Sequence, residues 1–114
     1  MHSNDTIRLR HMLDAAREAV SFAAGKNRGD LDTDRMRVLA LVKEIEIIGE
    51  AAFKVSQECR QKCPSIPWPD IIGMRHRLIH AYFDVDLDIV WDTVTNELPA
   101  LITVLQQLLS RADL

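Results

Sequence analysis

Apolar residues recur at steps of three and four along most of the chain, which is the spacing of an amphipathic helix. The first stripe comprises Leu9, Leu13, Ala16, Val20 and Ala23. It stops before a loop bounded by Gly25 and Gly29, so a first helix should end there. The second stripe comprises Val38, Leu41, Ile45, Ile48, Ala52 and Val55. The acidic cluster from Asp30 to Asp34 suits the start of this second helix, which we expect to end near Lys62.

Prolines mark the next boundary. Pro64, Pro67 and Pro69 enforce an extended turn, and residues 69–79 read as a short third helix with Trp68 packed at its start. A last stripe starts near Asp86 and comprises Leu87, Val90, Trp91, Val94, Leu98, Leu101, Leu105 and Leu108. We expect Pro99 to kink this helix or to break it in two. No window alternates apolar and polar residues as a strand does.

These stripes predict an all-α fold, an antiparallel bundle of four to five helices over a single domain, residues 1–114. The length of 114 residues and the 47% apolar content suit one core. Additional apolar residues widen the face of the second helix: Leu39, Val42 and Ile47. We therefore expect a homodimer formed through helices.

Charge and cysteine content remove several classes of protein. The net charge of -3 argues against a protein that holds nucleic acid merely by being basic. Cys59 and Cys63 are the whole cysteine complement, too few for a Cys₄ zinc site, and we expect two ordinary thiols. Neither a signal peptide nor a membrane-spanning run is apparent, so a cytoplasmic protein without membrane association is expected.

The segment 74–88, MRHRLIHAYFDVDLD, carries most of the candidate chemistry. It combines Arg75, His76, Arg77, His80 and the single Tyr82. On a continuous helix His80 would lie roughly 140° around from Arg75, at 100° per residue. The two side chains could then converge only across a helix end or across a dimer.

One interpretation of this segment is metal-free RNA cleavage. His80 would transfer protons near neutral pH, and the planar guanidinium of Arg75 would hold the phosphate and its developing charge. The 2′-hydroxyl of the RNA would attack the adjacent phosphorus, and Tyr82 would stack on an unpaired base or bind a phosphate. A dimer would supply two such histidines.

Other interpretations of these residues stay open. Arg and His side chains on a surface are commonly solvated or paired, and Asp84, Asp86 and Asp88 are near in sequence. His76 and His80, with Asp84, have a spacing that suits a metal on a helix, although the neighbouring arginines disfavour a cation. Glu50, in the second helix, would either orient Arg75 from across the bundle or lie exposed at its rim.

The stretch 67–101, PWPDIIGMRHRLIHAYFDVDLDIVWDTVTNELPAL, resembles the HepT toxins, which are placed among the HEPN-domain ribonucleases. The similarity extends over the chain and includes KEIEIIGEAA in the second helix. Its most specific element is the motif Arg-x4-His-x-Tyr, met by Arg75, His80 and Tyr82 without a change in spacing. His76 stands where a small polar residue, often Asn, would be expected.

The resemblance implies a metal-independent endoribonuclease without a cofactor, the toxic half of a type VII toxin–antitoxin pair. It implies a homodimer whose paired motifs line one cleft and an antitoxin that is an MntA-like nucleotidyltransferase. This partner would transfer AMP to Tyr82, adding negative charge beside Arg75 and bulk in the cleft. His76, Arg77 and Glu50 are supporting candidates. Transfer RNA and messenger RNA both stay open as substrates, and the alternative function is a non-catalytic scaffold of the nucleotidyltransferase.

Overall fold

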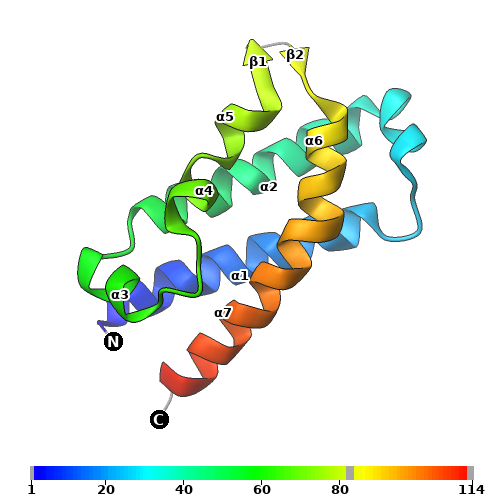
Figure 1. The fold of residues 1–114 in the computed structure, drawn as a ribbon. Coiled ribbons are helices and arrows are strands. Elements are labelled where there is room, and N and C mark those ends of the chain that lie inside the picture. Colours follow the sequence, from blue (N-terminus) through cyan, green and yellow to red (C-terminus); the bar gives the residue numbers. More distant parts are fainter. Residues whose placement is uncertain (1, 82–83, 113–114) are drawn as a thin grey trace.

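The computed structural model describes residues 2–81 and 84–112. Within these residues the chain is almost entirely helical (Figure 1). The helical segments are α1 (Ser3–Ala23), the 3-10 turn η1 (Arg28–Asp32), α2 (Arg35–Phe53), α3 (Gln57–Lys62), α4 (Trp68–Ile72), α5 (Met74–Leu78), α6 (Leu87–Asp92), the π-helical segment η2 (Thr93–Glu97) and α7 (Leu98–Ala112). Two short strands, β1 (Ile79–Ala81) and β2 (Asp84–Val85), form an antiparallel ribbon. The all-α bundle expected from the sequence is confirmed.

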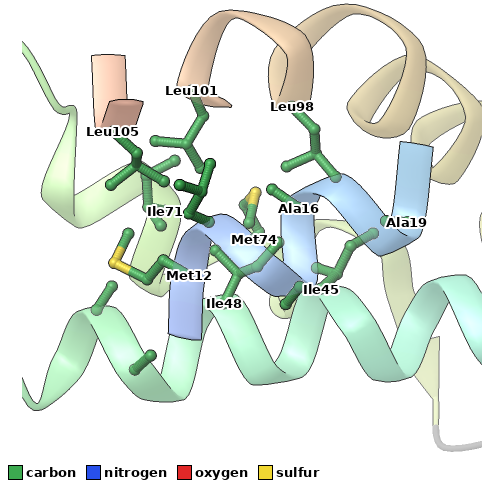
Figure 2. Close-up of a cluster of buried hydrophobic side chains, with 14 of the residues drawn as sticks. Met12, Ala16, Ala19, Ile45, Ile48, Ile71, Met74, Leu98, Leu101 and Leu105 are labelled. Carbon is green, nitrogen blue, oxygen red and sulfur yellow. The ribbon is translucent and has the colours of Figure 1, made fainter. Parts of the chain in front are cut away.

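Helices α1, α2 and α7 form the body of the bundle. In Figure 1, α1 runs between α2 and α7 and is antiparallel to both, and the ribbon β1–β2 stands at the end away from the termini. Buried side chains from five helices meet in the centre, as Figure 2 shows for Met12, Ala16 and Ala19 of α1, Ile45 and Ile48 of α2, Ile71 of α4, Met74 of α5, and Leu98, Leu101 and Leu105 of α7. The apolar stripes of the sequence are therefore the core.

The start of α2 follows from the predicted caps. Asp34 is the N-cap residue, and its Oδ1 accepts a hydrogen bond from the backbone N–H of Arg37 at 3.1 Å. Asn27 and Asp30 form a reciprocal capping box around η1. α1 ends at Ala23, before Gly25, which has a positive φ of 75° that suits glycine.

The expected end of the second helix near Lys62 is wrong. α2 ends at Phe53, and a separate helix, α3, follows after Ser56. The buried carboxylate of Asp5 in α1 accepts hydrogen bonds from the backbone N–H and the hydroxyl of Ser56, at 2.8 and 2.7 Å. This contact between distant residues fixes Ser56 as an N-cap and interrupts the helical pattern. Both cysteines near α3 are buried free thiols, and burial raises the pKa of Cys59 to about 12.

The third helix also differs from expectation. Residues 69–79 are not one helix, because the chain divides at Gly73 into α4 and α5 and leaves the helical conformation at Ile79. The expectation of no strand is wrong for the short ribbon β1–β2, whose strands are too brief to produce a visible alternation. Trp68 is buried at the start of α4, and its indole N–H donates to the carbonyl of Cys63 at 3.1 Å.

The last helical run begins as expected at Asp86, the N-cap of α6. It stays helical to Ala112, but residues 93–97 widen into the π-helical segment η2. Pro99 is the second residue of α7, immediately after this segment. A proline lacks the N–H that a continuous α-helix needs, so the regular α-helical hydrogen bonding is interrupted where Pro99 would have to donate.

Candidate functional site

The basic side chains of segment 74–88 lie on α5 and on the ribbon that follows it. α5 packs against α2, α4 and α6 and ends at Leu78. There the carbonyl of Leu78 accepts a hydrogen bond from the backbone N–H of Asp86 at 2.7 Å. A helix end therefore lies between Arg75 and His80, and the 140° separation of a continuous helix does not apply to this pair.

His80 faces a carboxylate. Its Nε2 is 3.3 Å from Oδ2 of Asp86, and its side chain is 57% exposed. The other carboxylate oxygen of Asp86 accepts a hydrogen bond from the backbone N–H of Ile89 at 3.1 Å. This bond, together with the bond to His80, lowers the pKa of Asp86 below its usual value. The carboxylate that orients His80 is therefore anionic at neutral pH and held in place by the first turn of α6.

Arg75 points to a different element. Its Nε is 3.5 Å from Oε1 of Glu46 on α2, and the Arg75 side chain is 46% exposed. An ion pair that is open to solvent is weak, so an anionic ligand can replace Glu46 at modest cost. Glu50 lies one turn further along α2, is exposed, and lines the same cavity as Arg75 and His76.

The other candidates are arranged around this pair. Arg77 lies 3.4 Å from a carboxylate oxygen of Glu97 in η2, and His76 is exposed beside the cavity next to α2. Tyr82 lies outside the described residues. The structure thus brings Arg75 and His76 together at α2, and directs Arg77 to η2 and His80 to α6.

The two alternative interpretations fare differently. Pairing of the basic residues with carboxylates is observed: Asp86 pairs with His80, whereas Asp88 pairs with Arg28 at 2.6 Å. For a metal site, the helical i, i+4 relation of His76 and His80 is lost because α5 ends at Leu78. Among residues 2–81 and 84–112, no three His, Cys, Asp or Glu side chains are grouped to hold a metal ion.

Two acidic residues, Asp86 and Glu46, pair with the candidate residues His80 and Arg75, and the sequence alone assigned neither of them a role in the site. Asp86 had an indication in the sequence, because the pattern predicted a helix start there and an acidic partner for a basic residue nearby. Glu46 had none, because only the packing of α5 on α2 brings it to Arg75. Contacts between segments this far apart in the chain follow from tertiary structure alone.

Comparison with known proteins places the chain in a family. The family model for HepT-like ribonucleases matches residues 12–108, which include all of segment 74–88. The chain belongs to the HepT-like ribonuclease family. The match also spans α2 and α6, the two elements that supply Glu46 and Asp86.

Individual relatives of this HepT-like chain are bacterial and archaeal. A protein of Caldanaerobacter subterraneus subsp. tengcongensis named "Putative RNase TTE0752" is 35% identical over 103 residues, 90% of this chain and 92% of the relative. "Putative RNase MJ1380" of Methanocaldococcus jannaschii is 31% identical over 77% of this chain and 81% of its own. "Probable ribonuclease HepT" of Thermococcus cleftensis is 39% identical over 63% of this chain and 66% of its own. No solved structure matches the chain.

No helix in the described part of the chain has both the length and the apolar character needed to cross a bilayer.

Proposed function

We propose that this protein is an endoribonuclease that cuts RNA without a metal ion and acts as the toxin of a toxin–antitoxin pair. The observation that carries the proposal is the HepT-like family match over residues 12–108. The geometry around His80 supports it, because a histidine that faces a fixed carboxylate is suited to proton transfer.

In the proposed reaction His80 removes the proton from a 2′-hydroxyl of the RNA. The 2′-oxygen forms a bond to the adjacent phosphorus, Arg75 holds the negative phosphoryl oxygens, and the bond from phosphorus to the 5′-oxygen breaks. The leaving 5′-oxygen takes a proton from the His80 of the second protomer of a homodimer. The product carries a 2′,3′-cyclic phosphate. If Nε2–H donates to Asp86, the lone pair of Nδ1 is the base.

We further propose that a nucleotidyltransferase antitoxin silences the enzyme by attaching AMP to the Tyr82 hydroxyl. The hydroxyl oxygen would attack the α-phosphorus of ATP, with pyrophosphate as the leaving group. Tyr82 lies four residues after Leu78, the last residue of α5, on the same segment as His80. A phosphodiester there would add negative charge to the segment that carries the basic candidates and would exclude RNA by its bulk.

The test of the activity is incubation of total RNA in EDTA with the wild-type protein and with His80→Ala, followed by analysis of fragment ends. We expect wild-type cleavage with cyclic phosphate ends and a loss on the order of a hundredfold or more in the variant, the usual contribution of general acid–base catalysis. His11→Ala is the matched control, because His11 is exposed on α1 and outside segment 74–88.

Equal cleavage by wild type and His80→Ala would contradict the proposed role of His80. Absence of cleavage by a wild-type protein shown by mass spectrometry to carry no AMP would favour the scaffold function instead. Growth after expression alone, and with the nucleotidyltransferase, separates the same two functions, since a scaffold should not arrest cells.

A further inference from the structure

A groove lies between α2 and the short helices α4 and α5. Its volume is about 250 Å³. Its lining includes Glu46, Gly49, Glu50, Phe53, Arg75 and His76. The catalytic proposal uses only Arg75 among them, so the rest of the groove needs an explanation.

Glycine and phenylalanine shape this groove. A Cβ on Gly49 would lie 3.3 Å from the carbonyl oxygen of Ile72, so α2 and α4 approach closely at this point and the backbone forms the floor. Phe53, at the end of α2, lines the groove although its side chain is 68% exposed. An aromatic ring that is open to solvent beside a cavity offers a face on which a planar group can stack.

Charge divides the groove into two parts. Arg75 and His76 lie on the α5 side, and the carboxylates of Glu46 and Glu50 project from successive turns of α2. Glu46 is engaged with Arg75, whereas Glu50 is one turn closer to Phe53, at a spacing of three residues. An anion suits the part beside Arg75 and His76. A planar group with N–H donors on its edge suits the part between Glu50 and Phe53.

We propose that this groove binds one unpaired nucleobase of the RNA next to the phosphate held by Arg75. The base stacks on Phe53, and the carboxylate of Glu50 accepts hydrogen bonds from its Watson–Crick edge. Guanine fits best, because its N1–H and N2 amino group offer two adjacent donors to the two carboxylate oxygens. Uracil fits worst, because its single N3–H lies between two carbonyl oxygens that a carboxylate repels.

This inference rests on the proposed function for the RNA ligand and for the assignment of its phosphate to Arg75. A protein partner explains the groove less well, because charged residues are depleted at the centres of protein interfaces and this cavity is bounded by charges of both signs. Stacking of a base on an aromatic side chain is, in contrast, the usual way in which proteins bind single-stranded RNA.

The test uses guanosine 5′-monophosphate and uridine 5′-monophosphate as probes, titrated into the full-length protein while amide NMR spectra are recorded. We expect shifts at Gly49 and Ile72, with the guanosine nucleotide binding at least about fivefold more tightly, the low end for a good bidentate base contact. Phe53→Leu should weaken both nucleotides at least about fivefold, because it keeps an apolar side chain but removes the ring. Phe53→Trp should restore binding.

Two further variants separate the parts of the groove. Glu50→Gln should abolish most of the preference for guanosine while leaving stacking intact. Met36→Ala is the matched control, because Met36 is 83% exposed on the same helix and should change neither affinity nor preference. Wild-type affinity of Phe53→Leu, or equal binding of the two nucleotides by the wild type, would overturn the proposal.

Cleavage assays keep the two proposals distinguishable. If wild type cuts RNA and Phe53→Leu gives the same fragments at the same rate, the base site is wrong and the ribonuclease proposal stands. If nucleotide binding depends on Phe53 but no RNA is cut, the ribonuclease proposal fails and the base site stands. If Phe53→Leu changes the oligomeric state on gel filtration and no nucleotide binds, the groove is an interface between protein chains.

Discussion

Carboxylates fix the directions of the basic side chains in the candidate site. Asp86, the N-cap of α6, faces His80, and Glu46 of α2 faces Arg75. Neither carboxylate belongs to α5, the helix that carries Arg75. All of these pairs are at least partly exposed, so each contributes little to the free energy of unfolding. Their consequence is orientation: the basic side chains are positioned before a ligand arrives and can still exchange their partners for phosphate.

The contribution of Asp86 can be separated from its role as a helix cap. Asp86→Asn keeps an N-cap side chain of comparable quality, so the melting temperature should change by only a few degrees. The neutral amide no longer stabilises or orients the imidazolium of His80, and we expect RNA cleavage to fall at least about tenfold. Thermal denaturation and initial cleavage rates measure the two effects, and an unchanged rate would exclude Asp86 from the reaction.

The sequence was sufficient to select Arg75 and His80 as candidates, because few side chains combine those chemistries within six positions. It was insufficient for Glu46, whose proximity depends on how α5 packs on α2. For Glu50 the sequence left two alternatives, orientation of Arg75 or an exposed position at the rim. The structure leaves Glu50 exposed and pairs Arg75 with Glu46, one turn earlier on the same helix. Neighbouring turns of a helix face differ too little in sequence pattern to be distinguished.

Between elements, the contact of α1 with α2 contains an acidic pair. Glu44 of α2 is 7% exposed and lies beside Glu18 of α1. Burial, followed by the charge of Glu18 and a hydrogen bond to it, raises the pKa of Glu44 from 4.5 to about 7. The folded protein therefore binds a proton at this position more tightly than the unfolded chain does.

The pair of Glu44 and Glu18 should make the free energy of unfolding depend on pH. Because the folded-state pKa of Glu44 is raised, its contribution to the free energy of unfolding is full below about pH 4.5 and is lost as the pH rises to about 7. Glu44→Gln should remove this decline, so the difference in melting temperature between variant and wild type should grow over that interval. Glu50→Gln, on the exposed face of α2, should leave the profile unchanged. Parallel profiles for wild type and Glu44→Gln would contradict the assignment.

Element boundaries show where sequence patterns lose their information. The starts of α2 and α6 were predicted because Asp34 and Asp86 cap them locally. The end of α2 at Phe53 was missed because its cause, the hydrogen bonds from Ser56 to Asp5, joins residues 51 positions apart. The ribbon β1–β2 was missed because strands of three and two residues carry no readable period.

At the scale of the whole molecule, one cluster of buried side chains joins the helices that carry the site. Ile48 is fully buried in α2 and lies at the centre of the group in Figure 2, with side chains of α1, α4, α5 and α7 around it. The position of α5, and hence of Arg75, depends on this cluster, because α5 contributes the buried residues Met74 and Leu78 to it.

Truncation of Ile48 should therefore weaken the entire fold. Ile48→Ala removes buried methyl and methylene groups, and we expect it to lower the free energy of unfolding by about 2–5 kcal/mol. Lys43→Ala is the control on the same helix, because Lys43 is exposed, and its effect should stay within about 0.5 kcal/mol. Urea denaturation followed by circular dichroism measures both, and equal losses would show that the centre of the core lies elsewhere.

The placement of the termini has a practical consequence for handling the protein. The start of α1 and the end of α7 line a common pocket, and Figure 1 places both at the opposite end of the bundle from the ribbon β1–β2. A fluorophore, an affinity tag or a sensor surface attached through either terminus would therefore be remote from Arg75 and His80. If the proposed RNA binding is correct, protein immobilised in this way should bind oligonucleotides as the free protein does, and a dye near the start of α1 should report on a second dye near the end of α7.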